Sequence, residues 1–178
     1  KVLYIEQNDF MEDPPKKYYR LTPGKEVRFR YAYFITCQEA IKDVAGNVIE
    51  LRCTYDPETK GGNSSDGRKI KGTIHWVSAE HAIDADINMY EHLFDHPNPG
   101  VEGDLIDDIN PNSLTTLTGC KLEPSLANSV VGEAVQFERN GYFAVDPSST
   151  PDHLIYNQTM AMRDSWAKIQ AKDMSAGK

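Results

Sequence analysis

The stretch Val135-Gln136-Phe137-Glu138-Arg139-Asn140-Gly141-Tyr142-Phe143 places an Asn-Gly pair between two apolar, β-prone runs. Asn-Gly favours the positive backbone dihedrals of a two-residue type I′ turn, which joins antiparallel strands tightly. The stretch therefore predicts a β-hairpin within residues 132–145 that turns at Asn140-Gly141.

Other parts of the chain also alternate apolar and polar residues with the period of a strand. Between Val27 and Thr36 one face would carry Val27, Phe29, Tyr31, Tyr33 and Ile35, and the other Arg28, Arg30 and Thr36. Further strands are expected in residues 48–55, 68–77 and, more weakly, 85–94, with a loop at 60–67 and short helices at 80–85 and 163–172. Many short strands with frequent turns predict an all-β fold, either a barrel or a sandwich.

Length and composition limit the class of protein. The 178 residues, 39% of them hydrophobic, suffice for one ordinary domain or two small ones with a real core. No run approaches the roughly 18 apolar residues of a membrane span, and the N-terminus lacks the apolar segment of a signal peptide. The chain does not begin with methionine, which suggests a processed chain or a fragment. Cys37, Cys53 and Cys120 are expected to be buried free thiols in a reducing cytoplasm.

The charge is divided along the chain. The net charge is -8, which argues against a non-specific coat for nucleic acid. However, residues 16–30 hold six basic residues and one acid, Glu26, whereas residues 84–108 hold eight acids and no lysine or arginine. Because a polyanion responds to the local field, residues 16–30 remain a candidate nucleic-acid surface.

Two acidic or histidine clusters suggest chemistry only weakly. His92 and His96 could share a metal on a helix, but Pro97 follows and the segment has the pattern of a strand end, so no metal site is expected. Asp104, Asp107 and Asp108 could form a carboxylate pair for acid–base catalysis, but no apolar pocket pattern surrounds them, so we expect a solvated acidic loop.

Basic and aromatic residues interleave in Lys16-Lys17-Tyr18-Tyr19-Arg20 and again in Arg28-Phe29-Arg30-Tyr31. Arginine supplies paired donors for phosphates and guanine edges, and tyrosine supplies a face for an unstacked base. The alternative is that the tyrosines belong to the core and the arginines to a solvated face. The alternation itself favours a core position for Tyr31 and Tyr33.

Four blocks of the chain, in this order, resemble the C-terminal region of bacterial glutaminyl-tRNA synthetases. They are Arg68-Lys69-Ile70-Lys71-Gly72-Thr73-Ile74-His75-Trp76-Val77-Ser78, Leu93-Phe94 with Pro97-Asn98-Pro99-Gly100, Val135 to Phe143, and Arg163-Asp164-Ser165-Trp166-Ala167-Lys168. The resemblance extends over nearly the whole chain. Glutamyl-tRNA synthetases of the non-discriminating and eukaryotic types share some of these blocks.

The resemblance implies the anticodon-binding part of a class I aminoacyl-tRNA synthetase, a glutamine–tRNA ligase. The family's ATP- and glutamine-binding catalytic domain precedes this region, and its HIGH and KMSKS signatures are absent here, so the chain is expected to be inactive alone. The implied fold is two β-barrels that resemble a ribosomal-protein barrel, with the distal barrel at 16–96 and the proximal barrel at 1–15 plus 97–178. The implied partners are the tRNA(Gln) anticodon loop and the catalytic domain of the same polypeptide, in a cytoplasmic monomer without a membrane. No cofactor is expected in this chain, since ATP and magnesium belong to the parent enzyme.

The resemblance also assigns residues. Arg20 corresponds to an arginine that reads the third anticodon base, a guanine, while Arg28 and Arg30 correspond to a pair near the first anticodon nucleotide. Gln136 and Arg139 correspond to residues that read the middle uracil, and Glu138 to one near the first base. Candidate backbone or stacking contacts are Lys16, Lys17, Tyr19, Lys69 and Lys71. Tyr19 departs from the family, which has a lysine there. Strict alternation places Arg139 opposite Gln136, so its assignment requires a bulge before the turn.

Other functions stay open at this point. The chain could be the same region of a glutamyl-tRNA synthetase, or a free-standing barrel that binds RNA or a protein. A carbohydrate-binding or hydrolytic β module that uses the acidic segment is the weakest alternative.

Overall fold

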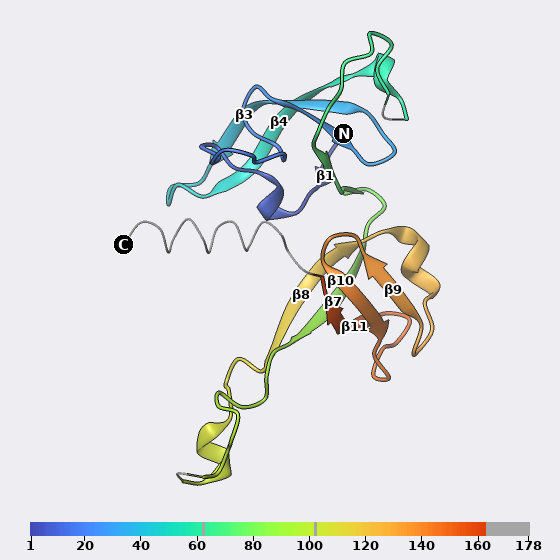
Figure 1. The fold of residues 1–178 in the computed structure, drawn as a ribbon. Coiled ribbons are helices and arrows are strands. Elements are labelled where there is room, and N and C mark those ends of the chain that lie inside the picture. Colours follow the sequence, from blue (N-terminus) through green and yellow to red (C-terminus); the bar gives the residue numbers. More distant parts are fainter. Residues whose placement is uncertain (62, 102, 163–178) are drawn as a thin grey trace. The chain divides into compact units, whose positions relative to one another are not determined.

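The structure is a computed structural model, and it describes residues 1–61, 63–101 and 103–162. These residues form two compact units, which divide between His81 and Ala82 (Figure 1). The predicted domains, 16–96 and 1–15 plus 97–178, have other bounds. Residues 1–15 lie in the first unit here, and the assignment of barrels to the chain stays a prediction.

The first unit is built from short strands and two 3₁₀ turns. Its elements are β1 (Leu3–Tyr4), η1 (Gln7–Asp9), β2 (Glu26–Phe29), β3 (Phe34–Lys42), β4 (Val48–Asp56), η2 (Pro57–Thr59), β5 (Thr73–Ile74) and β6 (Val77–Ser78). The main sheet has the order β4-β3-β2-β5, with β2 and β5 parallel, and β1 pairs with β6 in a separate ribbon.

The long β3–β4 hairpin follows directly from its turn sequence. The Asp43 carboxylate accepts hydrogen bonds from the backbone amides of Ala45 and Asn47, at 2.9 and 2.8 Å, which is the usual way for Asp to fix a turn. Gly46 takes φ +87°, which a residue with a side chain adopts at a cost. The predicted strand at 48–55 is confirmed as β4.

The predicted strand at 27–36 is wrong in its middle. β2 ends at Phe29, and a turn through Arg30, Tyr31 and Ala32 leads into β3, closed by a 2.9 Å hydrogen bond from the Ala32 amide to the Phe29 carbonyl. Tyr31 takes φ +57° and is 85% exposed. Tyr31 is therefore not a core residue, whereas Tyr33 is half-buried against the core of this unit.

The core of the first unit forms where the alternation holds. Its buried side chains are Leu21, Val27, Phe29, Ile35, Cys37 and Ile74. Val27 and Phe29 point into this core from β2, so that Glu26 and Arg28 lie on the other face of the strand. The hydrophobic face thus fixes the side of β2 on which Arg28 lies.

The second unit is a five-stranded sheet. Its elements are β7 (Ile83–Tyr90), η3 (Leu105–Asp108), β8 (Leu114–Leu122), η4 (Pro124–Asn128), β9 (Ala134–Phe137), β10 (Gly141–Val145) and β11 (Leu154–Ala161). The order is β8-β7-β11-β10-β9, and β11 runs parallel to β7. Its core contains Ala85, Ile87, Leu122, Phe143, Val145, Leu154 and Tyr156.

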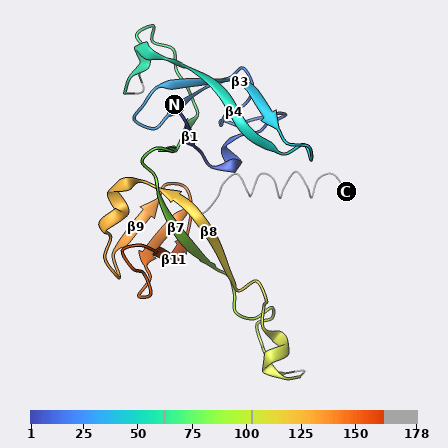
Figure 2. The same cartoon turned by 180° about the vertical axis from the view of Figure 1, so that it is seen from behind.

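Some of the strands and helices predicted from the sequence can be checked in this unit. The hairpin at 132–145 is confirmed as β9 and β10, but its loop is Glu138-Arg139-Asn140, because Gly141 already pairs with Phe137. The helix expected at 80–85 is wrong, since β7 begins at Ile83, and the one expected at 163–172 lies outside the described residues. Between β7 and β8 the chain continues as a long extension that carries η3 (Figures 1 and 2).

The all-β class is confirmed: strands dominate, and the helices among the described residues are short 3₁₀ turns. None of the described helices is long and apolar enough to span a bilayer. The hydrogen-bonded order of each sheet is open, so closure into barrels remains an expectation from the resemblance.

Candidate nucleic-acid interface

Arg28 lies on the face of β2 that points away from the core. Its guanidinium lies over the Phe34 ring at 5.4 Å, and its Nε is buried without a hydrogen-bond partner among the described residues. Arg28 also lines a hollow of about 490 Å³ together with Asn63, Ser64, Gly67, Arg68, Lys69 and Ile70. A buried donor without an acceptor is costly, so the hollow beside it suits an anionic or carbonyl acceptor.

Arg30 does not share the strand face of Arg28, contrary to the alternation. It follows the end of β2, and its guanidinium lies 5.1 Å from the centre of the exposed Tyr31 ring. The backbone of Arg30 is tied on both sides, since its amide donates to the Ile74 carbonyl at 3.1 Å and its carbonyl accepts from Trp76 Nε1 at 2.9 Å. The two arginines therefore present their charge from a strand and from a turn.

Arg20 is held by an acid of its own unit. Its Nε lies 3.5 Å from Asp9 Oδ1, and its Nη1 donates to the Asn8 carbonyl at 3.1 Å. The Asp9 side chain is 1% exposed and that of Arg20 is 20% exposed. These contacts orient the guanidinium and use part of its five N–H donors, so that the remaining donors could meet a base edge.

Lys16 and Lys17 form an exposed turn, in which Lys17 takes φ +72°. Lys69 and Lys71 are exposed residues of the irregular segment that precedes β5, where a continuous strand over 68–77 was expected. Among the described residues, neither Lys69 nor Lys71 has an ion pair or a hydrogen bond from its ammonium group. Their charges are therefore available to a ligand.

A second hollow, of about 300 Å³, lies beside Tyr19. It is lined by Tyr19, Lys25, Glu26, Val27, Lys69, Ile70, Lys71 and Gly72. Lys69 and Ile70 line both hollows, so the two are neighbours. The structure thus brings Tyr19, Arg28, Lys69 and Lys71 to one surface of the first unit, as the candidate contacts require.

Lys25 and Gly72 belong to this surface but were not singled out from the sequence. An isolated glycine within a strand pattern signals a close backbone approach, and that signal was present at Gly72. A Cβ built there would lie 2.0 Å from the Tyr19 carbonyl oxygen. Nothing in the sequence pattern distinguishes Lys25 from the other lysines.

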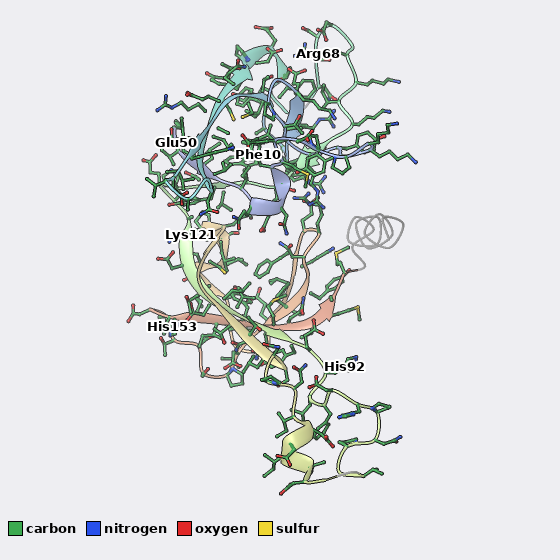
Figure 3. The ribbon with its side chains drawn as sticks, turned by 90° about the vertical axis from the view of Figure 1, so that its left-hand side faces the viewer. Phe10, Glu50, Arg68, His92, Lys121 and His153 are labelled. Carbon is green, nitrogen blue, oxygen red and sulfur yellow. The ribbon has the colours of Figure 1, made fainter. Side chains whose placement is uncertain are left out.

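Arg68, labelled in Figure 3, forms ion pairs with acids of its own unit. Its guanidinium donates to Glu26 at 2.9 and 3.0 Å and also pairs with Asp56 and Asp66. The Arg68 amide and guanidinium lower the pKa of Asp66 to about 2, and the guanidinium lowers that of Asp56. The three carboxylates in turn raise the pKa of Arg68. One guanidinium is shared by three carboxylates, so Arg68 offsets only part of the negative charge of Glu26, Asp56 and Asp66.

Gln136, Glu138 and Arg139 lie in the second unit. Gln136 is an exposed residue of β9 and its Nε2 lies 3.4 Å from Met162 Sδ, whereas Glu138 and Arg139 lie in the loop to β10. Arg139 takes φ +68°. Because Arg139 lies in the loop, the alternation of β9 does not place it on the face of Val135 and Phe137. Its assignment therefore needs no bulge in the strand.

The acidic segment contains local structural pairs. His96 Nε2 lies 3.2 Å from Asp108 Oδ1, Asp108 Oδ2 accepts from the Gly100 amide at 2.7 Å, and Asp104 caps η3. In the described ranges, no three His, Cys, Asp or Glu side chains gather as metal ligands would.

Of the three cysteines, Cys37 is buried, Cys120 is half-buried and Cys53 is exposed, so buried thiols were predicted correctly only in part.

Comparison with known proteins gives two family matches with the same description. Both are "tRNA synthetases class I (E and Q), anti-codon binding domain", one over residues 1–56 and one over residues 73–146.

Among curated relatives, the glutamine–tRNA ligase of Nitrobacter winogradskyi is 54% identical over 169 residues, and that of Nitrobacter hamburgensis is 57% identical. Each alignment covers 95% of this chain and 30% of the relative. The glutamine–tRNA ligase of Rhodopirellula baltica is 51% identical over 96% of this chain and 29% of its own length. The chain thus spans about three tenths of the length of these relatives.

Proposed function

Because this chain belongs to the family of anticodon-binding domains of class I tRNA synthetases for glutamate and glutamine, we propose that it binds the anticodon loop of tRNA(Gln). In this function it is the RNA-recognition part of a glutamine–tRNA ligase. The catalytic domain of the same polypeptide would bind ATP and magnesium and attach glutamine, and the enzyme would act as a monomer in the cytoplasm.

Glutamine is favoured over glutamate by the relatives. The family description covers both amino acids, but the relatives reported above are glutamine–tRNA ligases and match nearly the whole chain. The same matches disfavour a free-standing barrel protein, since each relative is much longer than this chain.

The observation that carries the proposal is the cationic surface of the first unit. Arg28, Lys69 and Lys71 line two adjacent hollows, and the exposed Tyr19 ring lines one of them. Single-stranded RNA is held by such a combination, because cations bind the backbone and aromatic faces stack on splayed bases. The overall charge of -8 opposes the binding of a polyanion over the whole chain, so attraction is confined to this local surface.

We assign base readout to three places. Arg20, oriented by Asp9 and Asn8, would pair with the guanine at the third anticodon position, where two parallel donors meet O6 and N7. Arg28 and Arg30 would hold the first nucleotide by its phosphate and base. In the second unit, Gln136 and Arg139 would meet the two carbonyl acceptors and the imino donor of the middle uracil, with Glu138 near the first base.

The test is a salt series of tRNA(Gln) binding with Arg28→Ala and a matched control, Arg52→Ala. Arg52 is exposed and, among the described residues, pairs with Glu39 and Glu50 on the surface of the same unit. Loss of one phosphate contact should lower the slope of log affinity against log salt by about 0.7. Arg52→Ala should leave the slope unchanged. No binding by the wild-type chain, or equal behaviour of the two variants, would refute the proposal.

A further inference from the structure

Tyr19 presents an aromatic ring to solvent from a rigid backbone. Its neighbour Tyr18 is 2% exposed and donates its hydroxyl to the Asn8 carbonyl at 3.1 Å, whereas Tyr19 is 46% exposed. Lys25 Nζ donates to the Tyr18 carbonyl at 3.0 Å. Gly72 packs against the Tyr19 carbonyl so closely that no larger residue fits. The ring therefore needs little further ordering before it contacts a ligand, which keeps the entropic cost of binding low.

Two ammonium groups lie over this ring. Lys71 Nζ is 5.3 Å and Lys25 Nζ is 5.8 Å from its centre, within the range of a cation–π interaction. Lys25 is fixed by its bond to Tyr18, but Lys71 has no acceptor among the described residues. Lys71 stands on a flexible four-carbon stem, so its ammonium can move from the ring to a phosphate.

The hollow beside the ring has the size and charge for one nucleotide. Its volume of about 300 Å³ is at the lower end for small-molecule sites, which suits a single unstacked nucleotide and not a duplex. Glu26 is an acid in its lining, but both of its carboxylate oxygens accept hydrogen bonds from Arg68. Lys25, Lys69 and Lys71 supply three positive charges against this one carboxylate, so the lining of the hollow is positive on balance.

We propose that Tyr19, Lys25 and Lys71 form a subsite for one splayed nucleotide of the anticodon loop. The base stacks on the Tyr19 ring, and the Lys71 ammonium binds the adjoining phosphate. This inference rests on the proposed function and deepens it, because it assigns the ring of Tyr19 and the ammonium of Lys71 to one and the same nucleotide, at a position where the family has a lysine in place of Tyr19.

The experiment measures the binding of an anticodon stem-loop that carries 2-aminopurine at one loop position at a time. The wild-type chain and Tyr19→Phe should both quench one loop position, because either ring stacks on a base. Tyr19→Leu should abolish the quenching and weaken binding by about 5- to 150-fold, the loss expected for one stacked base. The control is Tyr4→Leu, since Tyr4 is 43% exposed in the same unit and does not line the hollow, and it should change neither quantity.

Lys71→Gln tests the phosphate contact. It should lower the salt slope by about 0.7, as expected for one phosphate on a single strand. If the wild-type chain binds and Tyr19→Leu shows the same affinity and the same quenching as the wild-type chain, the subsite is overturned but the proposed function stands. Absence of tRNA(Gln) binding by the wild-type chain would overturn both. Circular dichroism of each variant shows that it is folded.

Discussion

Substitution of Gly72 by alanine should destabilise the first unit. The new Cβ would lie 2.0 Å from the Tyr19 carbonyl oxygen and 2.9 Å from the carbonyl carbon, well inside the roughly 3.5 Å at which non-bonded atoms pack. Both neighbours are backbone atoms, so no side-chain rotation relieves the contact. Overpacking of this kind costs about 1–3 kcal/mol, and the depth of the overlap places Gly72→Ala at the upper end.

The loss of stability from the steric overlap is partly offset by a smaller effect of Gly72→Ala on the unfolded chain. Gly72 has no positive φ, so alanine restricts the unfolded chain and gives back about 0.4–1 kcal/mol. The expected net loss is about 2 kcal/mol, which corresponds to a fall of roughly 8–16 °C in Tm for a unit of this size. Since Gly72 supports the backbone of Tyr19, the variant should also bind tRNA(Gln) more weakly.

Fluorescence-detected unfolding of the first unit measures the effect. Trp76 packs on Phe29 with ring centres 6.2 Å apart and reports on this unit, and the second tryptophan, Trp166, is removed by Trp166→Phe in all samples. Gly103→Ala, in the second unit, is the background control, because a Cβ there meets nothing within 4 Å and Trp76 should report no change. A loss for Gly72→Ala no larger than that for Gly103→Ala would refute the close approach of residues 19 and 72.

Three further outcomes are expected. The pKa of Asp66 is lowered to about 2, so its ionised form stabilises the fold above the usual carboxyl pKa of about 3.9, and this stabilisation is lost as the pH falls through the folded value. Asp66→Asn should therefore reduce the acid-dependent loss of stability between about pH 4 and about pH 2. A stability difference between variant and wild type that does not depend on pH would contradict this. The Tyr156 hydroxyl is buried without a partner among the described residues, so Tyr156→Phe should raise the free energy of unfolding of the second unit by about 1 kcal/mol in urea denaturation, and a loss would show a hidden partner. Arg20→Ala should cost about 1–3 kcal/mol of binding to tRNA(Gln) and much less with another third base, and equal losses would reduce Arg20 to a phosphate contact. Thermal unfolding is measured alongside, because the buried Asp9 loses a partner.

The sequence pattern predicted strands where apolar residues alternate with polar ones on a buried face. It therefore found β2, while the turn sequences at 43–47 and 140–141 located β4 and the β9–β10 hairpin, and it failed where neither signal is present. Leu114–Leu122 is exposed along most of its length, so β8 shows no apolar alternation. The alternation also ran through Tyr31 without a break, because an aromatic residue in the left-handed region carries no turn signature.

The candidate site could be predicted in its residue types but not in its assembly. Arg28, Lys69 and Lys71 stand out as cations within strand-like patterns. Their proximity depends on the parallel pairing of β2 with β5, which aligns Arg28 with Thr73 across a long separation in sequence. No local rule specifies that pairing, so the neighbourhood of Tyr19, Lys25 and Gly72 emerges only from the fold.

The ion cluster of Arg68 has a practical consequence for engineering. Arg68 closes the segment that follows β4 by binding Asp56 at the start of that segment and Glu26 on β2. The ends of the segment are thereby held together independently of its length, and the entropy of closing a loop grows only slowly as residues are added. A peptide tag or a fluorophore site inserted after the exposed Lys60 should leave the strand register intact, which gives an attachment point for single-molecule measurements on this unit.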